Sequence, residues 1–320
     1  MLKRWVKIAA MVLILLVSAA TGGLAEVKVL VIPKGTEAVF WKNVAAGAKK
    51  AGDELGIHVT YRGPLSAVQH DAQIQIIEYG IRGGYHAIVL APNHVTLPAP
   101  ALERAVAAGM KVVLIDSNMD SHHHACFVES DNYRAGQVAA DYAASLVGGA
   151  GRVALVRYLK NHASTLERER GFLDAIATRY PQMEVIADPH AGPSIGTAFR
   201  IVSDLIDRFS PIDAIFTDAE STTLGVLRAL REKHPRGKVK FIGFDFNATI
   251  RAAILNREIT ATIIQNPFQM GYRGVTAAYD LVQGKAVAEK IYTDTILVTA
   301  DNYHTEAVQK ILRSNTPVAD

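Results

Sequence analysis

Cysteine is nearly absent from this sequence: Cys126 is the only one among 320 residues. No disulfide can therefore form within the chain. A strand-like pattern over residues 125–129 surrounds Cys126, so we expect it to be a small buried apolar residue. The composition, 49% hydrophobic and 20% charged, is typical of a globular protein with a packed core, and the length suffices for two domains.

Several motifs for cofactors and catalysis are also missing. No G-x-G-x-x-G follows a strand, and neither the P-loop pattern G-x-x-x-x-G-K-[ST] nor H-E-x-x-H occurs. The glycine-rich residues 148–151 precede a strand and not a helix, so we interpret them as a loop and not as a phosphate cradle. The sequence therefore predicts no bound cofactor.

The histidine tract His122-His123-His124 is the strongest candidate for a metal site. Adjacent residues of an extended chain point to opposite sides, so at most two of these rings could share one ion. The tract lies in a predicted loop just before a strand. We favour a solvated loop over a metal site and predict no metal.

Acidic residues are absent from the first 25 positions, where Lys3, Arg4 and Lys7 precede a short apolar run over residues 8–20. Small residues, Gly23 and Ala25, follow at the positions that a signal peptidase reads. We predict a signal peptide over residues 1–25 and a periplasmic location; an uncleaved anchor is the alternative. Without those three basic residues the charge is balanced, so composition does not predict a nucleic-acid partner.

Short β-rich runs alternate with helical patterns along the rest of the chain. This alternation with short connections predicts an α/β fold with mostly parallel, doubly wound sheets and right-handed crossovers. The pattern restarts near residue 126, and so many strands predict two similar domains. The predicted strands are 27–32, 57–61, 87–90, 112–115, 126–129, 153–156, 184–187, 214–217 and 239–242, and the predicted helices are 39–55, 66–82, 98–108, 132–147, 165–179, 195–209 and 221–233.

Polar side chains stand where several of these strands end. In residues 241–265 a strand stops at Asp245, a helix follows, and a second strand ends at Gln265. Ligands of open α/β sheets bind in the crevice outside the carboxyl ends of the strands, so both residues are candidate ligand contacts. The alternative is that Asp245 only caps the helix that starts near Asn247.

Further acids follow the same rule. Asp116 follows the apolar run 112–115, and Asp218 and Glu220 follow the strand 214–217. Arg168, early in a helix, is not explained by the helix dipole, and its planar fork would grip two vicinal oxygens. A surface helix rich in ion pairs is the alternative for Arg168.

Two aromatic residues, Phe40 and Trp41, open the first long helix. Consecutive helical residues cannot both face one sheet squarely, so we expect one ring to face a cleft above the strand ends. Such a face suits the C–H face of a sugar ring. The alternative is that both rings belong to the core.

Together these segments resemble the type I periplasmic sugar-binding proteins, the ribose-binding-protein-like receptors of ABC importers. The segments are VLVIPKG, VFWKNVAAGAKKAGDELG, GGYHAIVLAP, VVLIDS, SDNYRAGQVAADY, RERGF, FIGFD and ATIIQNPFQMG, in this order. The resemblance implies two Rossmann-like lobes joined by three hinge strands and closing on a ligand. It implies an N-terminal lobe of residues 26–130 plus 266–294 and a C-terminal lobe of residues 131–265 plus 295–320.

The same resemblance assigns ligand contacts by motif to Phe40, Trp41, Asp116, Arg168, Asp245 and Gln265, and places Asn132 at the first crossing. The chain departs from the sugar-binding pattern at Ser117, Ala91 and Ala219, so the resemblance does not point to ribose itself. Lys34 together with Asp116 is similar to the autoinducer-2 receptor branch, from which Glu167-Arg168 departs.

We therefore predict a monomeric extracytoplasmic solute-binding protein that captures a small hydroxyl-rich ligand, with a monosaccharide favoured. Its predicted contacts are Lys34, Phe40, Trp41, Asp116, Arg168, Asp218, Glu220, Asp245 and Gln265. The partner is the membrane permease of an ABC importer; a sensor histidine kinase or an autoinducer-2-type role is the alternative. An alternative from another functional class is a secreted α/β enzyme that uses Asp116, Asp218, Glu220 and Asp245 as acid–base groups.

Overall fold

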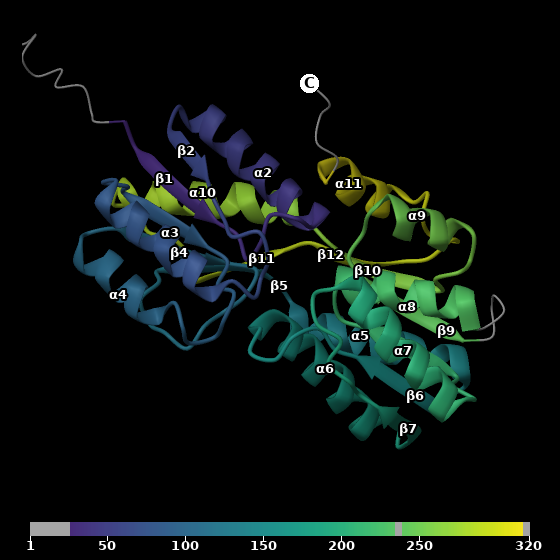
Figure 1. The fold of residues 1–320 in the computed structure, drawn as a ribbon. Coiled ribbons are helices and arrows are strands. Elements are labelled where there is room, and N and C mark those ends of the chain that lie inside the picture. The colour runs from purple at the N-terminus through teal and green to yellow at the C-terminus, as the bar shows by residue number, and fades with distance from the viewer. Residues whose placement is uncertain (1–25, 234–238, 316–320) are drawn as a thin grey trace, which may run out of the picture.

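Two α/β lobes lie side by side in the structure, each built around a six-stranded sheet (Figure 1). The structure is a computed structural model and describes residues 26–233 and 239–315. The predicted signal peptide lies outside the described residues. The predicted fold class, two doubly wound lobes, is confirmed.

The N-lobe is the name used here for the first sheet and the helices packed on it. Its strand order is β11-β5-β4-β3-β1-β2, and every pairing is parallel. The strands are β1 Lys28–Ile32, β2 His58–Tyr61, β3 Ala87–Leu90, β4 Lys111–Ile115, β5 Cys126–Ser130 and β11 Lys290–Thr293. The helices are α2 Val39–Leu55, α3 His70–Arg82, α4 Ala99–Ala107 and α10 Pro267–Val282.

The C-lobe repeats this plan in the second half of the chain. Its strand order is β12-β10-β9-β8-β6-β7, parallel except for β12, which runs antiparallel to β10. The strands are β6 Ala150–Val156, β7 Gln182–Ala187, β8 Ala214–Thr217, β9 Lys240–Phe244, β10 Ala261–Gln265 and β12 Thr295–Val298. The helices are α5 Asn132–Val147, α6 Ala163–Arg179, α7 Ile195–Phe209, α8 Glu220–Lys233, α9 Ala248–Leu255 and α11 Glu306–Ser314.

The chain passes between the two sheets three times. It leaves the N-lobe after β5, returns after β10 and leaves again between β11 and β12. The last residues before these crossings, Ser130, Gln265 and Thr293, are hydrogen-bonded to one another through Ser130: its Oγ donates to Gln265 Oε1 at 2.9 Å and lies 3.4 Å from Thr293 Oγ1. The three crossings thus form one connected hinge.

Local sequence explains where most elements begin and end. The central strands are continuous apolar runs with fully buried side chains, as expected for parallel strands covered by helices on both faces. Gly56, at φ 64°, ends α2 in the left-handed conformation. Asp131, Ser194 and Asn266 each accept a backbone N–H at the start of the following helix.

Two predicted boundaries are wrong by three residues or more. Helix α3 begins at His70 and not at residue 66, because the Ser66 N–H is bound by Gln69 Oε1 and the Leu65 carbonyl accepts from Thr36 N–H. Residues 65–67 are therefore held as a loop against the segment after β1. Residues 150–151 belong to strand β6 and not to the predicted glycine loop; Gly151, at φ 143°, pairs with Met183.

Each lobe contains a pair of helices whose backbones touch. A Cβ atom on Gly271 would lie 2.0 Å from the Val44 carbonyl oxygen, and one on Gly171 would lie 2.0 Å from the Tyr133 carbonyl oxygen. Helices α2 and α10, and likewise α5 and α6, therefore pack with only hydrogen atoms between them at these points. The second pair fixes the position of α6, which carries Arg168.

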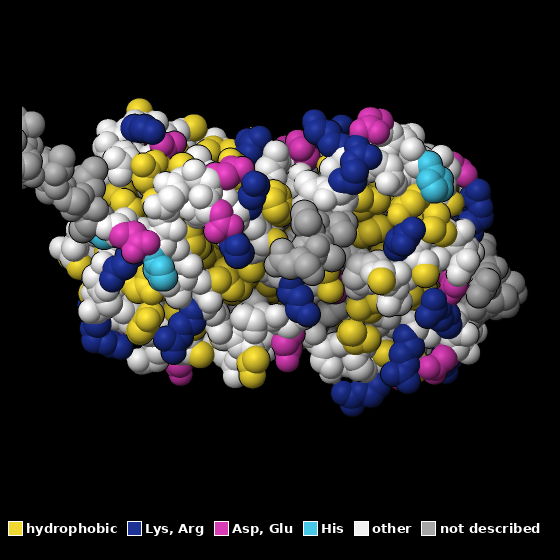
Figure 2. All heavy atoms as spheres, turned by 90° about the horizontal axis from the view of Figure 1, so that it is seen from above, with side chains coloured by type: hydrophobic (Ala, Val, Ile, Leu, Met, Phe, Trp, Pro, Cys, Tyr) yellow, Lys and Arg dark blue, Asp and Glu magenta, His cyan; other side chains and the backbone are white. Residues whose placement is uncertain are grey.

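The surface mixes both signs of charge. Figure 2 shows Lys and Arg side chains interspersed with Asp and Glu over one face of both lobes, with apolar patches between them. Within the described ranges, no helix is both long and apolar enough to cross a membrane. The single cysteine, Cys126, is fully buried, as predicted.

Candidate functional site

A cavity of about 290 Å³ lies between the lobes, at the carboxyl ends of strands from both sheets. This volume is near the lower end of the range of about 300–1,000 Å³ for small-molecule pockets. The sites predicted from sequence converge on it, with one exception. The lining includes Lys34, Phe40, Trp41, Asp116, Arg168, Glu220, Asp245 and Gln265, and also Leu65, Ser66, Ala67, Tyr158, Ser164, Thr165, Pro193, Ile195 and Leu224.

Two acids occupy equivalent places in the two lobes. Asp116 follows β4 at φ 64°, and Asp245 follows β9 at φ 68°. Each donates its backbone N–H to the neighbouring strand: Asp116 to the Val128 carbonyl at 3.0 Å and Asp245 to the Ile263 carbonyl at 2.9 Å. The left-handed conformation is costly for a residue with a Cβ, and such outliers cluster at functional sites. It turns both carboxylates into the cavity.

The interpretation of Asp245 as a helix cap is wrong. Asn247 caps α9, with its Oδ1 accepting the Ile250 N–H at 2.9 Å. Asp245 instead accepts Gln265 Nε2–H at 2.7 Å on Oδ1 and the Glu220 N–H at 3.1 Å on Oδ2. Burial raises its pKa, and the nearby Arg168 charge opposes that rise.

Glu220 is the first residue of α8 and approaches the N-lobe. Its Oε1 accepts Asn247 Nδ2–H at 2.9 Å, whereas its Oε2 is buried without a hydrogen-bond partner. Burial, reinforced by the Asp245 charge, raises the pKa of Glu220 to about 7. The Asn247 amide and the Phe40 backbone N–H oppose that rise, and Oε2 makes no well-aligned hydrogen bond within the protein, so it is available at the cavity wall.

Arg168 is buried, and the protein accepts hydrogen bonds from two of its five N–H donors. Nε donates to Asn132 Oδ1 at 2.8 Å, and Nη1 donates to the Asp218 carbonyl at 2.8 Å. The guanidinium lies 3.8 Å from the Phe244 ring centroid. Nη2 is buried without a protein partner, so a rigidly held cationic donor faces the cavity. The surface ion-pair alternative for Arg168 is therefore wrong.

Lys34 occupies the other end of the cavity and is 6% exposed. Its ammonium lies 2.5 Å from Asp116 Oδ2, and it donates to Ser117 Oγ at 2.6 Å and to Ser164 Oγ at 3.1 Å. Burial lowers the pKa of Lys34, and the Asp116 charge opposes that change. The carboxylate and two hydroxyls compensate for removal of the ammonium from water.

The aromatic residues form one corner of the cavity. Phe40 and Trp41 both line it, and their rings meet edge to face with centroids 4.8 Å apart. Trp41 also packs in the N-lobe core, so the core and cleft interpretations both hold for this ring. From the C-lobe, Tyr158 faces the same cavity and meets the His162 ring edge to face.

Asp218 is the exception among the predicted contacts. It is fully buried behind the cavity wall, where its Oδ2 accepts the Tyr158 N–H at 2.9 Å. Its carboxyl faces Glu169, and burial raises the pKa of Glu169 to about 9 and that of Asp218 to about 6. Two carboxyl groups buried so close together disfavour the state in which both are ionised. The expectation that residues after a strand face the cleft places Asp218 at the carboxyl edge of the sheet, but its side chain lies behind the cavity wall.

The family model described as a periplasmic binding protein domain matches residues 29–286. This chain belongs to that family. A solved carbohydrate transporter solute binding protein from Agrobacterium radiobacter, in complex with D-arabinose, is 30% identical, with a TM-score of 0.87 over 90% of this chain and 99% of that one. The periplasmic component of an ABC-type sugar transport system from Hahella chejuensis is 34% identical, with a TM-score of 0.82 over 85% and 99%.

Curated relatives agree with these structures. The ribose import binding protein of Bacillus subtilis (strain 168) is 28% identical over 255 residues, which are 79% of this chain and 80% of that protein. The D-allose-binding periplasmic protein of Escherichia coli (strain K12) is 26% identical over 295 residues, 88% of this chain and 94% of that protein. The predicted resemblance to periplasmic sugar-binding proteins of ABC transporters is confirmed.

Sequence reasoning missed part of the cavity of this periplasmic binding protein domain. Tyr158 follows β6 and obeys the same strand-end rule, so it could have been found. Ser164, in the first turn of α6, and Leu65, just before the residues wrongly assigned to a helix, carry no comparable signal. Their places depend on how the two lobes meet.

We expected no nucleophile elbow from the sequence, but one short pattern with that spacing is present. Gly192-Pro193-Ser194-Ile195-Gly196 has the spacing G-x-S-x-G of a nucleophile elbow. In the structure Ser194 is exposed and serves as the N-cap of α7, accepting the Thr197 N–H, and no described contact joins it to a histidine. This serine therefore lacks the base that a nucleophile needs.

The histidine tract His122–124 lies in a loop before β5, as predicted. Over residues 26–233 and 239–315, no group of three His, Cys, Asp or Glu side chains is placed to hold a metal ion.

Proposed function

We propose that this protein captures a small hydroxyl-rich ligand, a monosaccharide, and delivers it to the permease of an ABC importer. The observation that carries this proposal is the set of buried polar atoms without protein partners at the cavity. Arg168 Nη2 offers a donor and Glu220 Oε2 offers an acceptor. A sugar hydroxyl can accept from the first and donate to the second, and adjacent hydroxyls can do both at once.

The proposed contacts are Phe40, Trp41, Asp116, Arg168, Glu220, Asp245 and Gln265. Their chemistry supports a polyhydroxylated ring: carboxylate and amide oxygens accept from hydroxyls, and aromatic faces cover C–H groups. Lys34 acts in this scheme by holding Asp116, since its ion pair at 2.5 Å fixes that carboxylate. Asp218 supports Arg168 through its backbone carbonyl.

Closure of two units is the proposed mechanism. Residues 26–130 with 266–294 would move against residues 131–265 with 295–320 about the hinge of Ser130, Gln265 and Thr293. A ligand that contacts both units binds the closed form better and shifts the equilibrium toward it. The closed monomer would then be recognised outside the cytoplasm, after removal of residues 1–25, by the permease.

A thermal-shift screen tests ligand capture. The purified mature chain is heated with pentoses, hexoses and polyols, each at millimolar concentration, because a ligand bound only by the native state raises the apparent Tm. We expect a rise of several degrees for one or a few monosaccharides. No rise for any of them would contradict the proposal.

Recovery of the bound sugar separates binding from catalysis. The complex is denatured after long incubation and the released sugar is examined by mass spectrometry. Intact sugar supports a receptor, whereas a hydrolysed or rearranged product supports the α/β enzyme alternative. Stimulation of the ATPase of the reconstituted importer by the loaded protein then separates transport from signalling to a sensor kinase.

A further inference from the structure

The ammonium of Lys34 has no donor left for a ligand. A lysine ammonium has three N–H groups and no acceptor. In this structure they face Asp116 Oδ2 at 2.5 Å, Ser117 Oγ at 2.6 Å and Ser164 Oγ at 3.1 Å. Two of these partners belong to the N-lobe, as Lys34 does, and the third belongs to the C-lobe. One of the three N–H donors of Lys34 therefore bonds to the other lobe, through Ser164.

Ser164 is bound to the N-lobe by three hydrogen bonds in all. Besides the Lys34 contact, Ser117 Oγ donates to Ser164 Oγ at 2.8 Å, and the Ser164 backbone N–H donates to Ser117 Oγ at 3.1 Å. Ser117 is 1% exposed and Ser164 is 4% exposed. Hydrogen bonds in such a dry place are difficult for water to replace without separation of the lobes.

The hydrogen bond from the Ser164 N–H to Ser117 Oγ caps the N-terminus of α6. The first N–H groups of a helix have no partner within it, and the N-cap side chain of α6, His162, makes no capping hydrogen bond. Ser117, from the other lobe, accepts one of these N–H groups. A residue of the N-lobe thus performs the capping role for the C-lobe helix that carries Arg168.

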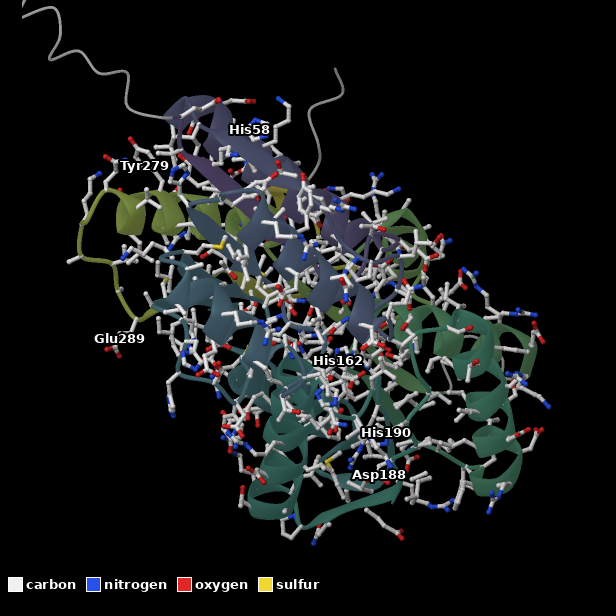
Figure 3. All side chains as sticks on the ribbon, turned by 60° about the vertical axis from the view of Figure 1, so that its left-hand side comes forward. His58, His162, Asp188, His190, Tyr279 and Glu289 are labelled. Atoms are coloured by element: carbon white, nitrogen blue, oxygen red, sulfur yellow. The ribbon has the colours of Figure 1, made fainter. Side chains whose placement is uncertain are left out.

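The neighbouring residues make the same junction. Asn161, at φ 65°, accepts the N–H of Val95 from the N-lobe at 3.1 Å. His162, labelled in Figure 3 where the two lobes meet, is 2% exposed. Residues 161–164 therefore form a compact contact segment, and opening of the lobes would break the contacts of Asn161 and Ser164 with the N-lobe.

We propose that Lys34 and Ser117 of the N-lobe and Ser164 of the C-lobe form a latch that stabilises the closed conformation even when no ligand is bound. This inference rests on the proposed function in one respect: it assumes that the two lobes open and close around a ligand. In the open form Lys34, Asp116 and Ser117 stay together within the N-lobe, and Ser164 and the first turn of α6 become hydrated. Lys34 is thus a positioning residue: it sets how readily the lobes close and how long they stay closed.

The latch is tested without any ligand, by the distance between the lobes. Spin labels are attached at Glu103→Cys on α4 and Arg200→Cys on α7, two exposed positions, while Cys126 is buried and stays unlabelled. Pulsed electron spin resonance then gives the distance distribution for the unlatched variants Ser164→Ala and Ser117→Ala. Ser164→Thr keeps a hydroxyl, and Ser145→Ala removes an exposed hydroxyl from α5, away from the junction.

We expect the ratio of closed to open form to fall about fivefold in both unlatched variants. Ser117→Ala removes the cap of α6, and Ser164→Ala removes the two side-chain hydrogen bonds of Ser164 to the N-lobe. Ser164→Thr should restore part of the closed population, and Ser145→Ala should match the wild type. Hydrogen exchange of the peptide that contains the Ser164 amide should become faster in Ser117→Ala to a similar degree. Equal Tm values would show that the variants remain folded.

Distance distributions of Ser164→Ala and Ser117→Ala that match the wild type would overturn the latch. So would unchanged hydrogen exchange at the Ser164 amide in Ser117→Ala. Failure of the sugar screen would contradict the proposed function instead, and it would leave these ligand-free measurements unaffected.

Discussion

Gln265 donates a hydrogen bond from Nε2 to Asp245 Oδ1 at 2.7 Å, and its Oε1 accepts from Ser130 Oγ at 2.9 Å. One amide side chain therefore joins the hinge to the acid that faces the cavity. Through Ser130 the connection reaches Thr293 at the third crossing. The position of Asp245 is thus coupled to the hinge, and a change at Gln265 should affect both.

Gln265→Met removes this donor while keeping a side chain of similar length. Asp245 Oδ1 then loses its partner in a buried place, which raises the pKa of Asp245 beyond the rise that burial already causes. We expect affinity for the sugar found in the screen to fall by about 2–5 kcal/mol. Isothermal titration calorimetry measures the loss, with Gln182→Met, at an exposed glutamine of β7, as the control. Equal affinities of the two variants would contradict the role of Gln265.

Arg168→Lys tests the planar fork at the centre of the site. A lysine cannot contact Asn132 Oδ1, the Asp218 carbonyl and a ligand together, nor lie flat on the Phe244 ring. We expect a loss of about 2–5 kcal/mol in sugar affinity. The neighbouring Arg170→Lys, an exposed partner of Glu167, is the matched control and should change affinity little. If both variants bind equally well, Arg168 does not contact the ligand.

Gly171→Ala probes the contact of α5 with α6. Its Cβ would lie 2.0 Å from the Tyr133 carbonyl oxygen, so the helices must separate. We expect a loss of about 1–3 kcal/mol in the free energy of unfolding, measured in urea, and weaker sugar binding because Arg168 moves with α6. Gly196→Ala is the control: its Cβ would meet only Ser194 Oγ at 3.8 Å, in helix α7, so it should not destabilise. An unchanged Gly171→Ala variant would show that the helix pair can relax freely.

The buried pair Glu169 and Asp218 should make stability fall as pH rises. Burial raises the folded-state pKa of Glu169 from 4.5 to about 9, so the folded state holds a proton that the unfolded state has lost above pH 4.5. The stability from this group is fully present below its unfolded pKa and disappears as pH rises through about 9. The slope approaches at most about 1.4 kcal/mol per pH unit for one proton.

Urea unfolding at pH 6.0 and pH 8.5 measures that slope for the wild type and for Glu169→Gln. Glutamine mimics the protonated acid but does not titrate, so the variant should lose much of the difference between the two pH values. Arg157, 3.5 Å from Glu169, and Asp188, which pairs with Arg157, are present in both proteins and act as a common background. An equal slope in the two proteins would mean that Glu169 does not hold the proton.

The sequence predicts most of this site because its rule is local. A polar residue directly after an apolar strand reaches the carboxyl edge of the sheet, and this holds for Asp116, Asp245 and Gln265. The rule fails at Asp218, because it gives the edge but not the rotation of the side chain. The carboxylate of Asp218 accepts the N–H of Tyr158, which follows the neighbouring strand β6. This hydrogen bond directs the side chain into the C-lobe.

The remaining gaps come from contacts between distant segments. Ser164 lies 130 residues from Lys34, and their contact depends on the relative position of two lobes. No local pattern encodes that position. The helix predicted from residue 66 failed for a related reason, since the Leu65 carbonyl accepts the N–H of Thr36, in the segment after β1, and the Ser66 N–H donates to Gln69 Oε1. Tertiary contacts override helical periodicity there.

Sugar affinity should rise with pH through about 7 because of Glu220. Its pKa in the free protein is raised to about 7, first by burial and then by the Asp245 charge, and Oε2 has no hydrogen-bond partner. A ligand hydroxyl that donates to Oε2 favours the carboxylate and lowers this pKa, so binding below pH 7 must release a proton. We expect weaker binding at pH 5.5 than at pH 8.0, and a nearly flat profile for Glu220→Gln. Calorimetry in two buffers of different ionisation enthalpy detects the released proton at pH 6. Binding that strengthens toward acid pH, or releases no proton, would show that the sugar does not use this oxygen.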